Sequence, residues 1–193
     1  MVSAAEQLEK PLPKPQRDLL GYASARILEA LLEGLIALEF LDKGYTRNAA
    51  GKTFQAWRAL TGALLALEID KLGKELGNKD KEWLIGKGIP RIPSSRLKSL
   101  ALLVEKAGYT GYHGYTSIAL DLHDYQYHGP DPDLALSRYR SREEAARDTL
   151  YLLEKLVNII EKRAKPKLEW SKKWTKDHEE ALQRLRERLA STY

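Results

Sequence analysis

Tyrosine and histidine are concentrated in one stretch of twenty residues, Tyr109 to His128, which reads YTGYHGYTSIALDLHDYQYH. The stretch holds five of the chain's ten tyrosines and three of its four histidines. Both side chains combine a flat apolar body with a hydrogen-bonding tip, and only histidine has an unperturbed pKa near neutrality. Such a stretch suits proton transfer or the stacking of bases. It equally suits a small core in which the aromatic bodies are buried and the polar tips reach water.

The second half of this stretch predicts a helix that separates its two histidines. At 3.6 residues per turn His123 and His128 lie about 140° apart, so one metal ion cannot bind both, and we expect no metal site. Asp121, Asp124 and His128 fall within about 60° of one another. A carboxylate so placed can orient an imidazole or raise its pKa, which makes His128 the preferred acid–base candidate. The alternative is an ordinary surface pair of Asp124 and His128 at a helix end.

The first half of the stretch predicts a loop, because Gly111 and Gly114 permit tight backbone turns on either side of His113. A glycine-hinged loop can serve as a lid, but an ordinary connection with a structural role for His113 is the favoured interpretation. The candidate rings for ligand binding are Tyr125 and Tyr127, in the predicted helix that follows.

The composition of the 193 residues restricts the chemistry further. Cysteine is absent, which excludes disulfides, thiolate metal sites and cysteine nucleophiles and is typical of a reducing cytosol. The N-terminus lacks the apolar core of a signal peptide, and no stretch approaches the roughly 20 apolar residues that span a bilayer. We therefore expect a cytoplasmic protein that does not enter a membrane. Phosphate-loop, dinucleotide-binding, HExxH and GxSxG motifs are missing, so no cofactor is indicated.

The net charge of +5 is concentrated in the C-terminal tail. Residues 162 to 193 hold ten Lys or Arg against five Asp or Glu, which leaves 22 against 22 in residues 1 to 161. Trp170 and Trp174 are interleaved with these lysines, and cations beside aromatic rings can hold phosphates while the rings stack on bases. The favoured alternative is a solvated helix of mixed charge. Its thin leucine seam is typical of a marginal or partner-dependent helix.

Apolar residues recur at helical intervals along the chain and no strand pair stands out, which predicts an all-α fold. Long helices joined by short turns pack antiparallel, so we expect an up-and-down helical bundle with an additional basic C-terminal helix. A capping box of Ser141 and Glu144 marks one helix start, and Pro166 is expected to end that helix. The expected helices cover residues 20–42, 46–76, 94–108, 116–127, 141–166 and 175–189. The expected domains are a proline-punctuated leader (1–16), the bundle (17–163) and a basic helical extension (164–193).

Three segments carry a resemblance to a known family. They are LEFLDKGYTRNAAGKTFQAWRALTGALLAL over 38–67, LHDYQYHGPDPD over 122–133, and the capped helix SREEAARDTLYLLEKLVNIIEKR over 141–163. In this order they resemble the HEPN superfamily, and within it the archaeal PaREP-type proteins, over roughly residues 17 to 163. The resemblance implies an all-α, often dimeric domain. Many HEPN domains are metal-independent ribonucleases, and others are inactive binding partners of nucleotidyltransferases.

The resemblance also assigns roles within the LHDYQYH segment. HEPN ribonucleases carry an arginine and a histidine four to six residues apart, and His128 falls on the motif histidine. Asp124 falls on the polar position after the arginine, while the arginine position itself holds His123. The implied reaction is acid–base cleavage with the 2′-hydroxyl as nucleophile, with His128 as base or acid and with His123 or Arg47 steadying the phosphate.

Three hypotheses follow from these observations. The first is a dimeric, HEPN-like accessory or binding module that recognises a nucleic acid, a nucleotide or a protein partner such as a nucleotidyltransferase. The second is a degenerate, metal-independent endoribonuclease of the toxin or defence type that uses His128. The third is a structural helical protein without a site. We rank the binding module first, because histidine is charged only in part near neutrality and replaces a permanent cation.

Overall fold

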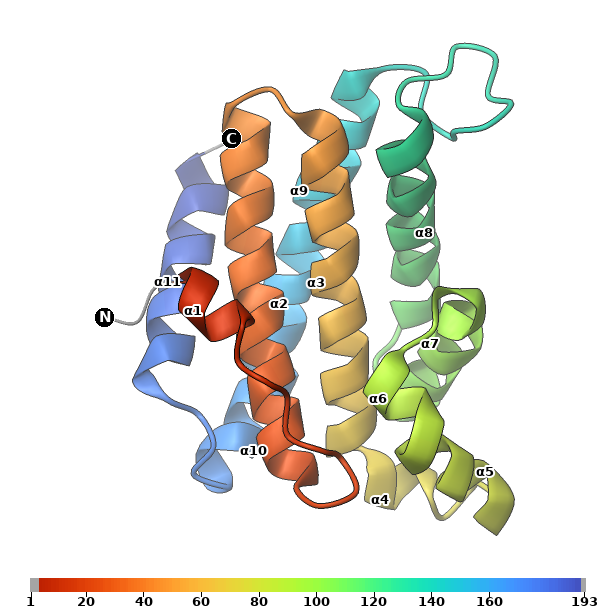
Figure 1. Ribbon diagram of the computed structural model, residues 1–193, viewed down its shortest axis with the longest axis vertical. Coiled ribbons are helices and arrows are strands. Elements are labelled where there is room, and N and C mark those ends of the chain that lie inside the picture. The colour runs from red at the N-terminus through yellow and green to blue at the C-terminus, as the bar shows by residue number, and fades with distance from the viewer. Residues whose placement is uncertain (1–3, 192–193) are drawn as a thin grey trace.

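The computed structural model describes residues 4 to 191, and every regular element in this part of the chain is a helix (Figure 1). The first three residues of the expected leader and the last two of the expected extension lie outside the described residues. The long helices run alternately up and down. They are α2 (Leu19–Asp42), α3 (Thr46–Leu67), α8 (Tyr112–His128), α9 (Arg142–Ile159) and α11 (Lys176–Ser191). The predicted all-α, up-and-down bundle is confirmed.

Helix α3 lies at the centre of the bundle, in contact with α2, α7, α8 and α9. Its sequence is rich in small residues, which lets neighbouring backbones approach closely, and 16 of its 22 residues are buried. Trp57 is fully buried there, with its ring stacked on Tyr112 at a centroid distance of 4.8 Å. Its indole Nε1 donates a hydrogen bond of 2.9 Å to Thr116 Oγ1. This pair of contacts joins α3 to α8 and satisfies the indole inside the core.

A run of short helices connects α3 to α8 across one end of the bundle (Figure 1). The helix expected to reach residue 76 ends at Leu67, because buried Glu68 turns out of helical geometry and accepts hydrogen bonds from Tyr109 and Lys167. The connecting elements are α4 (Ile69–Leu72), α5 (Asn78–Trp83), the π-helical turn η1 (Leu84–Gly88), α6 (Ile89–Arg91), the 3₁₀ turn η2 (Ser94–Arg96) and α7 (Leu97–Lys106).

Helix α8 begins four residues earlier than predicted, so the expected loop around His113 and Gly114 is wrong. The turn comes earlier, at Gly111, whose φ of 81° favours glycine. Tyr112 then enters the core completely and shares a 2.8 Å hydrogen bond with Thr61 of α3. Burial of this ring determines where the helix starts.

The capping box at the start of α9 is confirmed, since Ser141 Oγ accepts a hydrogen bond of 3.2 Å from the backbone N–H of Glu144. The expected end at Pro166 is wrong. The chain continues through a π-helical turn, η3 (Ile160–Ala164), into α10 (Lys165–Trp170). Pro166 lies in the first turn of α10, where a missing N–H costs little. The wider π turn changes the helical register just before it.

Helix α11 packs against α2 and α9 of the same chain. Its leucine seam is buried, and Leu185 is fully inaccessible. The seam approaches α2 at Gly34, where an added Cβ would lie only 3.1 Å from Leu185 Cδ2. The thin leucine seam is therefore sufficient to hold α11 on the bundle, because Gly34 of α2 lets the two helices approach closely.

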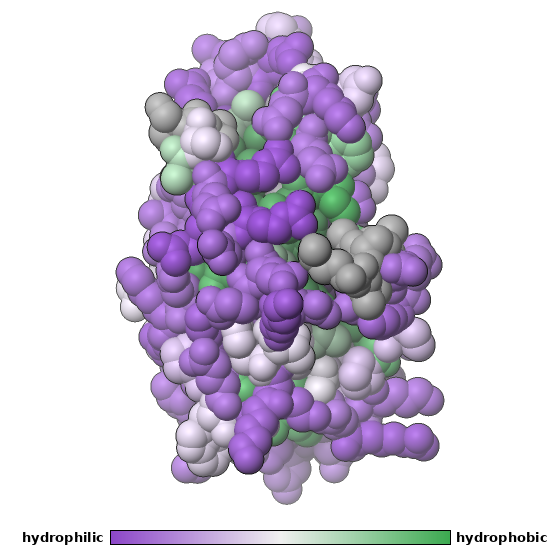
Figure 2. All heavy atoms as spheres, turned by 90° about the vertical axis from the view of Figure 1, so that its left-hand side faces the viewer, coloured by the Kyte–Doolittle hydropathy of each residue, from purple (hydrophilic) through white to green (hydrophobic). Residues whose placement is uncertain are grey.

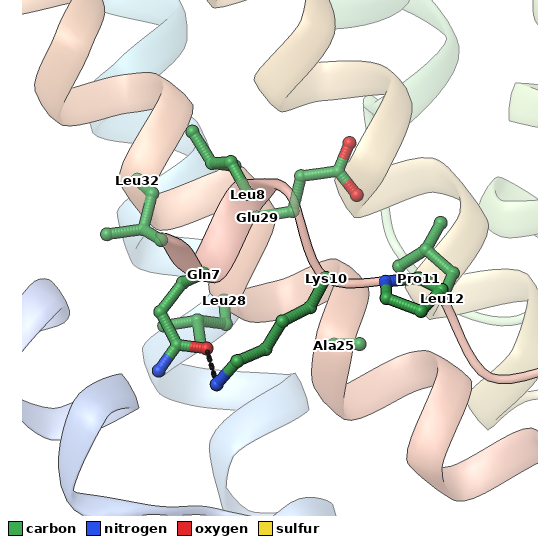
Figure 3. Close-up of a pocket in the computed structure, with 9 residues that line it drawn as sticks. All are labelled: Gln7, Leu8, Lys10, Pro11, Leu12, Ala25, Leu28, Glu29 and Leu32. Carbon is green, nitrogen blue, oxygen red and sulfur yellow. Dashed lines mark hydrogen bonds between the residues drawn. The ribbon is translucent and has the colours of Figure 1, made fainter. Parts of the chain in front are cut away.

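The leader, including α1 (Ala4–Leu8), crosses α2 and is held at two points (Figure 1). Gln7 Nε2 donates to Asp177 Oδ2 of α11 at 2.7 Å, and Gln16 Nε2 donates to the Ile85 carbonyl at 3.3 Å. Beneath the leader lies a recess, drawn in Figure 3, whose apolar wall is formed by Leu8, Leu28 and Leu32. The face that carries α11 is mostly hydrophilic (Figure 2). Within the described residues no helix is long and apolar enough to cross a membrane.

The burial of Leu185 predicts that α11 unfolds together with the rest of the bundle. We expect Leu185→Ala to lower the free energy of unfolding by about 2 to 4 kcal/mol, because it leaves a cavity between α11 and α2. Chemical denaturation followed by circular dichroism measures this. Leu136→Ala is the matched control, since that side chain is 66% exposed, and it should change stability by less than about 0.5 kcal/mol. Equal stabilities for the two variants would show that α11 is only loosely attached.

Candidate functional site: a polar groove along helix α3

Three tyrosines of the Tyr109–His128 stretch belong to the core. Tyr109, Tyr112 and Tyr125 are buried. The Tyr109 hydroxyl donates to Glu68 Oε1 at 2.7 Å, and the Tyr125 ring meets Tyr139 edge-on at 5.5 Å. Tyr125, a candidate for ligand binding, is 1% exposed and has no surface to offer a ligand. Tyr127, the other candidate ring, is exposed.

His123 faces α3 and packs its ring on Phe54, with centroids 4.0 Å apart and planes 18° apart. The Tyr127 ring packs edge-on against the His123 ring, with the two ring centroids 5.2 Å apart. Burial lowers the pKa of His123 below its ordinary value of 6.5; Asp124 opposes this shift and Arg58 adds to it. His123 is therefore mostly neutral at pH 7 and does not supply the permanent cation of the HEPN motif.

Asp121, Asp124 and His128 lie away from this ring stack. Burial raises the pKa of the Asp121 carboxyl, Arg138 opposes the shift, and the like charge of Asp124 adds to it. His128 is exposed in the last turn of α8. Among the described residues no hydrogen bond or ion pair joins His128 to Asp124. The structure thus brings the two carboxylates under one another's influence and leaves the imidazole in solvent.

Arg47, in the first turn of α3, is brought to the last turn of α8. Its guanidinium donates through Nε to the Gln126 carbonyl at 2.9 Å and through Nη2 to the Tyr127 carbonyl. A cation is favourable at a helix C-terminus, where carbonyls lack intrahelical partners. Arg47 therefore fixes the end of α8 beside His128.

A groove of about 490 Å³ lies between α2, α3 and α8, beside the Arg47 contact. The glycine at position 51 makes room for Gln126, since an added Cβ would lie 2.6 Å from Gln126 Cδ. Gln126 Oε1 and His123 Nδ1 are shielded from solvent, and the Gln126 side chain interacts with His123 and raises its pKa, although no hydrogen bond of good geometry joins the two. The groove is lined by Phe40, Arg47, Asn48, Gly51, Lys52, Gln55 and Gln126.

A row of charged side chains continues from the groove along α2 and α3. The Lys52 ammonium lies 3.0 Å from Glu33 Oε2, and this glutamate side chain is only 11% exposed. Burial raises the pKa of Glu33, with Lys52 opposing the shift. Further along, Arg26 pairs with Glu29 at 2.8 Å. Sequence reasoning missed this row, although charges at positions 26, 29 and 33 of an otherwise apolar helix are a recognisable signal.

The basic tail is neutralised largely within its own chain. Trp174 donates through Nε1 to Glu179 at 2.8 Å, while Trp170 is 90% exposed. Six basic side chains of the tail form ion pairs with carboxylates. They are Lys165, Lys167, Lys173, Lys176, Arg186 and Arg188. These pairs favour the solvated-helix interpretation over nucleic-acid binding by the tail.

Fold and groove together define an all-helical bundle protein with a partly buried polar groove on its central helix. Within the described residues no group of three or more His, Cys, Asp or Glu could hold a metal ion. The chain belongs to the archaeal PaREP1/PaREP8 family, whose model matches residues 25–150, a range that contains the groove and all of α8. The predicted PaREP resemblance is confirmed. Neither the curated proteins nor the solved structures yield a match to this chain.

The packing of His123 on Phe54 predicts a pH dependence. Because the folded chain holds the pKa of His123 below 6.5, the unfolded chain binds a proton first as the pH falls, and stability decreases below about pH 7. Ring signals of His123 in an NMR titration should have a midpoint below 6.5. The variant His123→Phe keeps the stacking and should lose less stability between pH 7.5 and 5.5.

Buried His178 adds a contribution of the same sign, because burial also lowers the pKa of this residue. The His123→Phe variant should therefore retain part of the pH dependence. A midpoint for His123 at or above 6.5 would contradict the burial argument.

Proposed function

We propose that this protein is a HEPN-like accessory or binding module that forms a homodimer through the face containing α2, α3 and α8. The observation that carries the proposal is the Glu33–Lys52 pair, a partly buried ion pair at the edge of an open groove that Lys52 lines. A second protein surface that covers the groove would exclude water from the ion pair.

The charges in the groove favour a copy of the same chain over a nucleic acid. Glu29 and Glu33 repel a phosphate backbone, whereas Arg26 and Lys52 lie beside them. In a two-fold interface the same patch meets itself, so each carboxylate can face its partner's cation. A patch of alternating sign is therefore self-complementary.

In this proposal the dimer acts in the cytoplasm and recognises a nucleic acid, a nucleotide or a protein partner such as a nucleotidyltransferase. It holds its target without a chemical step. The neutral, stacked state of His123 supports a binding role without catalysis, because a bound RNA phosphate would lack the cation that the motif arginine supplies in HEPN ribonucleases.

The proposal predicts a dimer that depends on the groove charges. Light scattering after size exclusion should give about twice the 21.9 kDa of one chain. Lys52→Glu should produce monomers, because it places two acidic side chains together in the groove. Glu33→Lys combined with Lys52→Glu should restore the dimer, since the exchanged pair remains self-complementary.

Lys43→Glu, at an exposed position near the end of α2, is the matched charge control and should remain dimeric. A monomeric wild-type protein at tens of micromolar, or an unchanged dimer in Lys52→Glu, would reject this interface.

A second candidate function, a degenerate endoribonuclease, is favoured by one observation. Arg47 is 79 residues from Gln126 in the chain, yet its guanidinium lies in the last turn of α8, beside His128. A permanent cation thus lies near the acid–base candidate even though the motif arginine is replaced. Against this function, two donors of Arg47 are already used to bind the helix end.

An RNA incubation separates the two functions. We expect single-stranded RNA to remain intact after prolonged incubation with the protein in EDTA, because His128 lacks an orienting carboxylate and His123 is neutral. Gel analysis against a His128→Ala sample measures this. Cleavage by the wild-type protein that disappears in His128→Ala would establish the ribonuclease instead.

A further inference from the structure

A second pocket lies at the other end of α8, where the segment 108–115 meets the end of α9 and the following π-helical turn. Its volume is about 420 Å³, within the range of small-molecule sites. Tyr109, Tyr115 and Ile159 supply apolar walls, and Lys155, Lys162 and Arg163 supply the charges. No carboxylate is among its lining residues.

The three cations share one side of a continuous helical segment. Positions 155, 158–159 and 162–163 recur at helical intervals, so their side chains point into the same pocket. The acidic residue between them, Glu161, is instead paired with Arg186 of α11 at 2.9 Å. In the part of the chain that the structure describes, no ion pair involves Lys155, Lys162 or Arg163. The pocket therefore carries uncompensated positive charge.

Two of these cations are held in place by aromatic rings. Lys155 Nζ lies 4.6 Å from the Tyr151 ring centre and 5.8 Å from that of Tyr115. The Arg163 guanidinium lies 4.4 Å from the Tyr109 ring centre and donates to the Gly108 carbonyl at 3.0 Å. Such contacts position the charges before a ligand arrives, which lowers the ordering cost of binding.

The start of α8 does not itself form the site. The backbone N–H of His113 already donates to Glu105 Oε2 at 2.8 Å, so the chain's own carboxylate caps this helix end. The nearby buried Glu68 is neutralised by Lys167 and accepts a hydrogen bond from Tyr109. Attraction for an anion therefore comes from the side-chain cations of the pocket.

We propose that this pocket binds a nucleoside phosphate, with the phosphate among Lys155, Lys162 and Arg163 and the base against the wall formed by Tyr115 and Ile159. Cations with an adjacent aromatic surface match a ligand that is anionic at one end and flat at the other. A long nucleic acid needs a basic track that continues beyond the pocket, but most of the tail's cations are paired. The site is about 20 Å along α8 from His128, so it is separate from the groove.

Titration calorimetry of the full chain with AMP, ATP, inorganic phosphate and adenosine tests the proposal. We expect saturable binding of AMP and ATP, with adenosine and phosphate each at least about tenfold weaker, because each lacks one of the two recognised parts. Lys162→Gln should weaken AMP binding about tenfold. This side chain is exposed, so the fold is not at risk.

Lys43→Gln removes the same charge at an exposed position near the opposite end of the bundle and should bind AMP as the wild type does. Lys155→Gln should weaken binding like Lys162→Gln, with an unchanged circular dichroism spectrum. Absence of AMP binding, or equal binding by all variants, overturns the proposal. Phosphate binding as tight as AMP, or tight binding of a 20-nucleotide RNA alone, also overturns it. A dimer that binds no nucleotide rejects this pocket alone, and a monomer that binds nucleotide rejects only the dimer.

Discussion

The burial of α3 on almost every side is the constraint on which the rest of the structure depends. A helix in this position must have small side chains where its neighbours cross it, and Gly51 and Gly62 lie at such close approaches. Its long polar residues are then confined to the one stripe that neighbours leave open. Lys52 there pairs with Glu33 of α2, and Arg58 donates to the Ile92 carbonyl of the connector at 3.1 Å. The polar groove is thus a consequence of how the core is packed.

The same constraint separates the tyrosine and histidine stretch into parts with different roles. Because α8 packs along α3, the residues that face α3 become core, including Tyr112 on Trp57 and His123 on Phe54. The residues on other sides face a pocket or solvent. The composition of the stretch suggests a single site. Helical geometry instead places these side chains in three surroundings: the core against α3, the polar groove and the second pocket.

Periodicity and turn residues in the sequence predicted the long helices and the Ser141 cap, because these depend on nearby residues. The PaREP resemblance came instead from three separate segments of the chain. The start of α8 was wrong because it depends on burial of Tyr112 against a helix that lies fifty residues earlier. The continuation past Pro166 depends on a change of helical register that no local pattern shows. Of the candidate site residues, Arg47 reaches the end of α8 only in the folded chain, since its hydrogen bonds join the start of α3 to the last turn of α8.

The distribution of basic residues shows most clearly why the fold must be known before a function is inferred from composition. The excess of basic residues lies in the tail, and that excess alone points to nucleic-acid binding there. After folding, most of these cations contact carboxylates, including Asp42 of α2, Glu68 just after α3, Glu161 of η3, and Glu179 and Glu180 of α11. Exposed pairs of this kind add little stability, yet they cancel the local field that would attract a phosphate. The field that remains belongs to cations that form no ion pair, and at Lys155, Lys162 and Arg163 it coincides with an aromatic-walled pocket. Local pairing, and not net charge, therefore indicates where this protein can hold an anion.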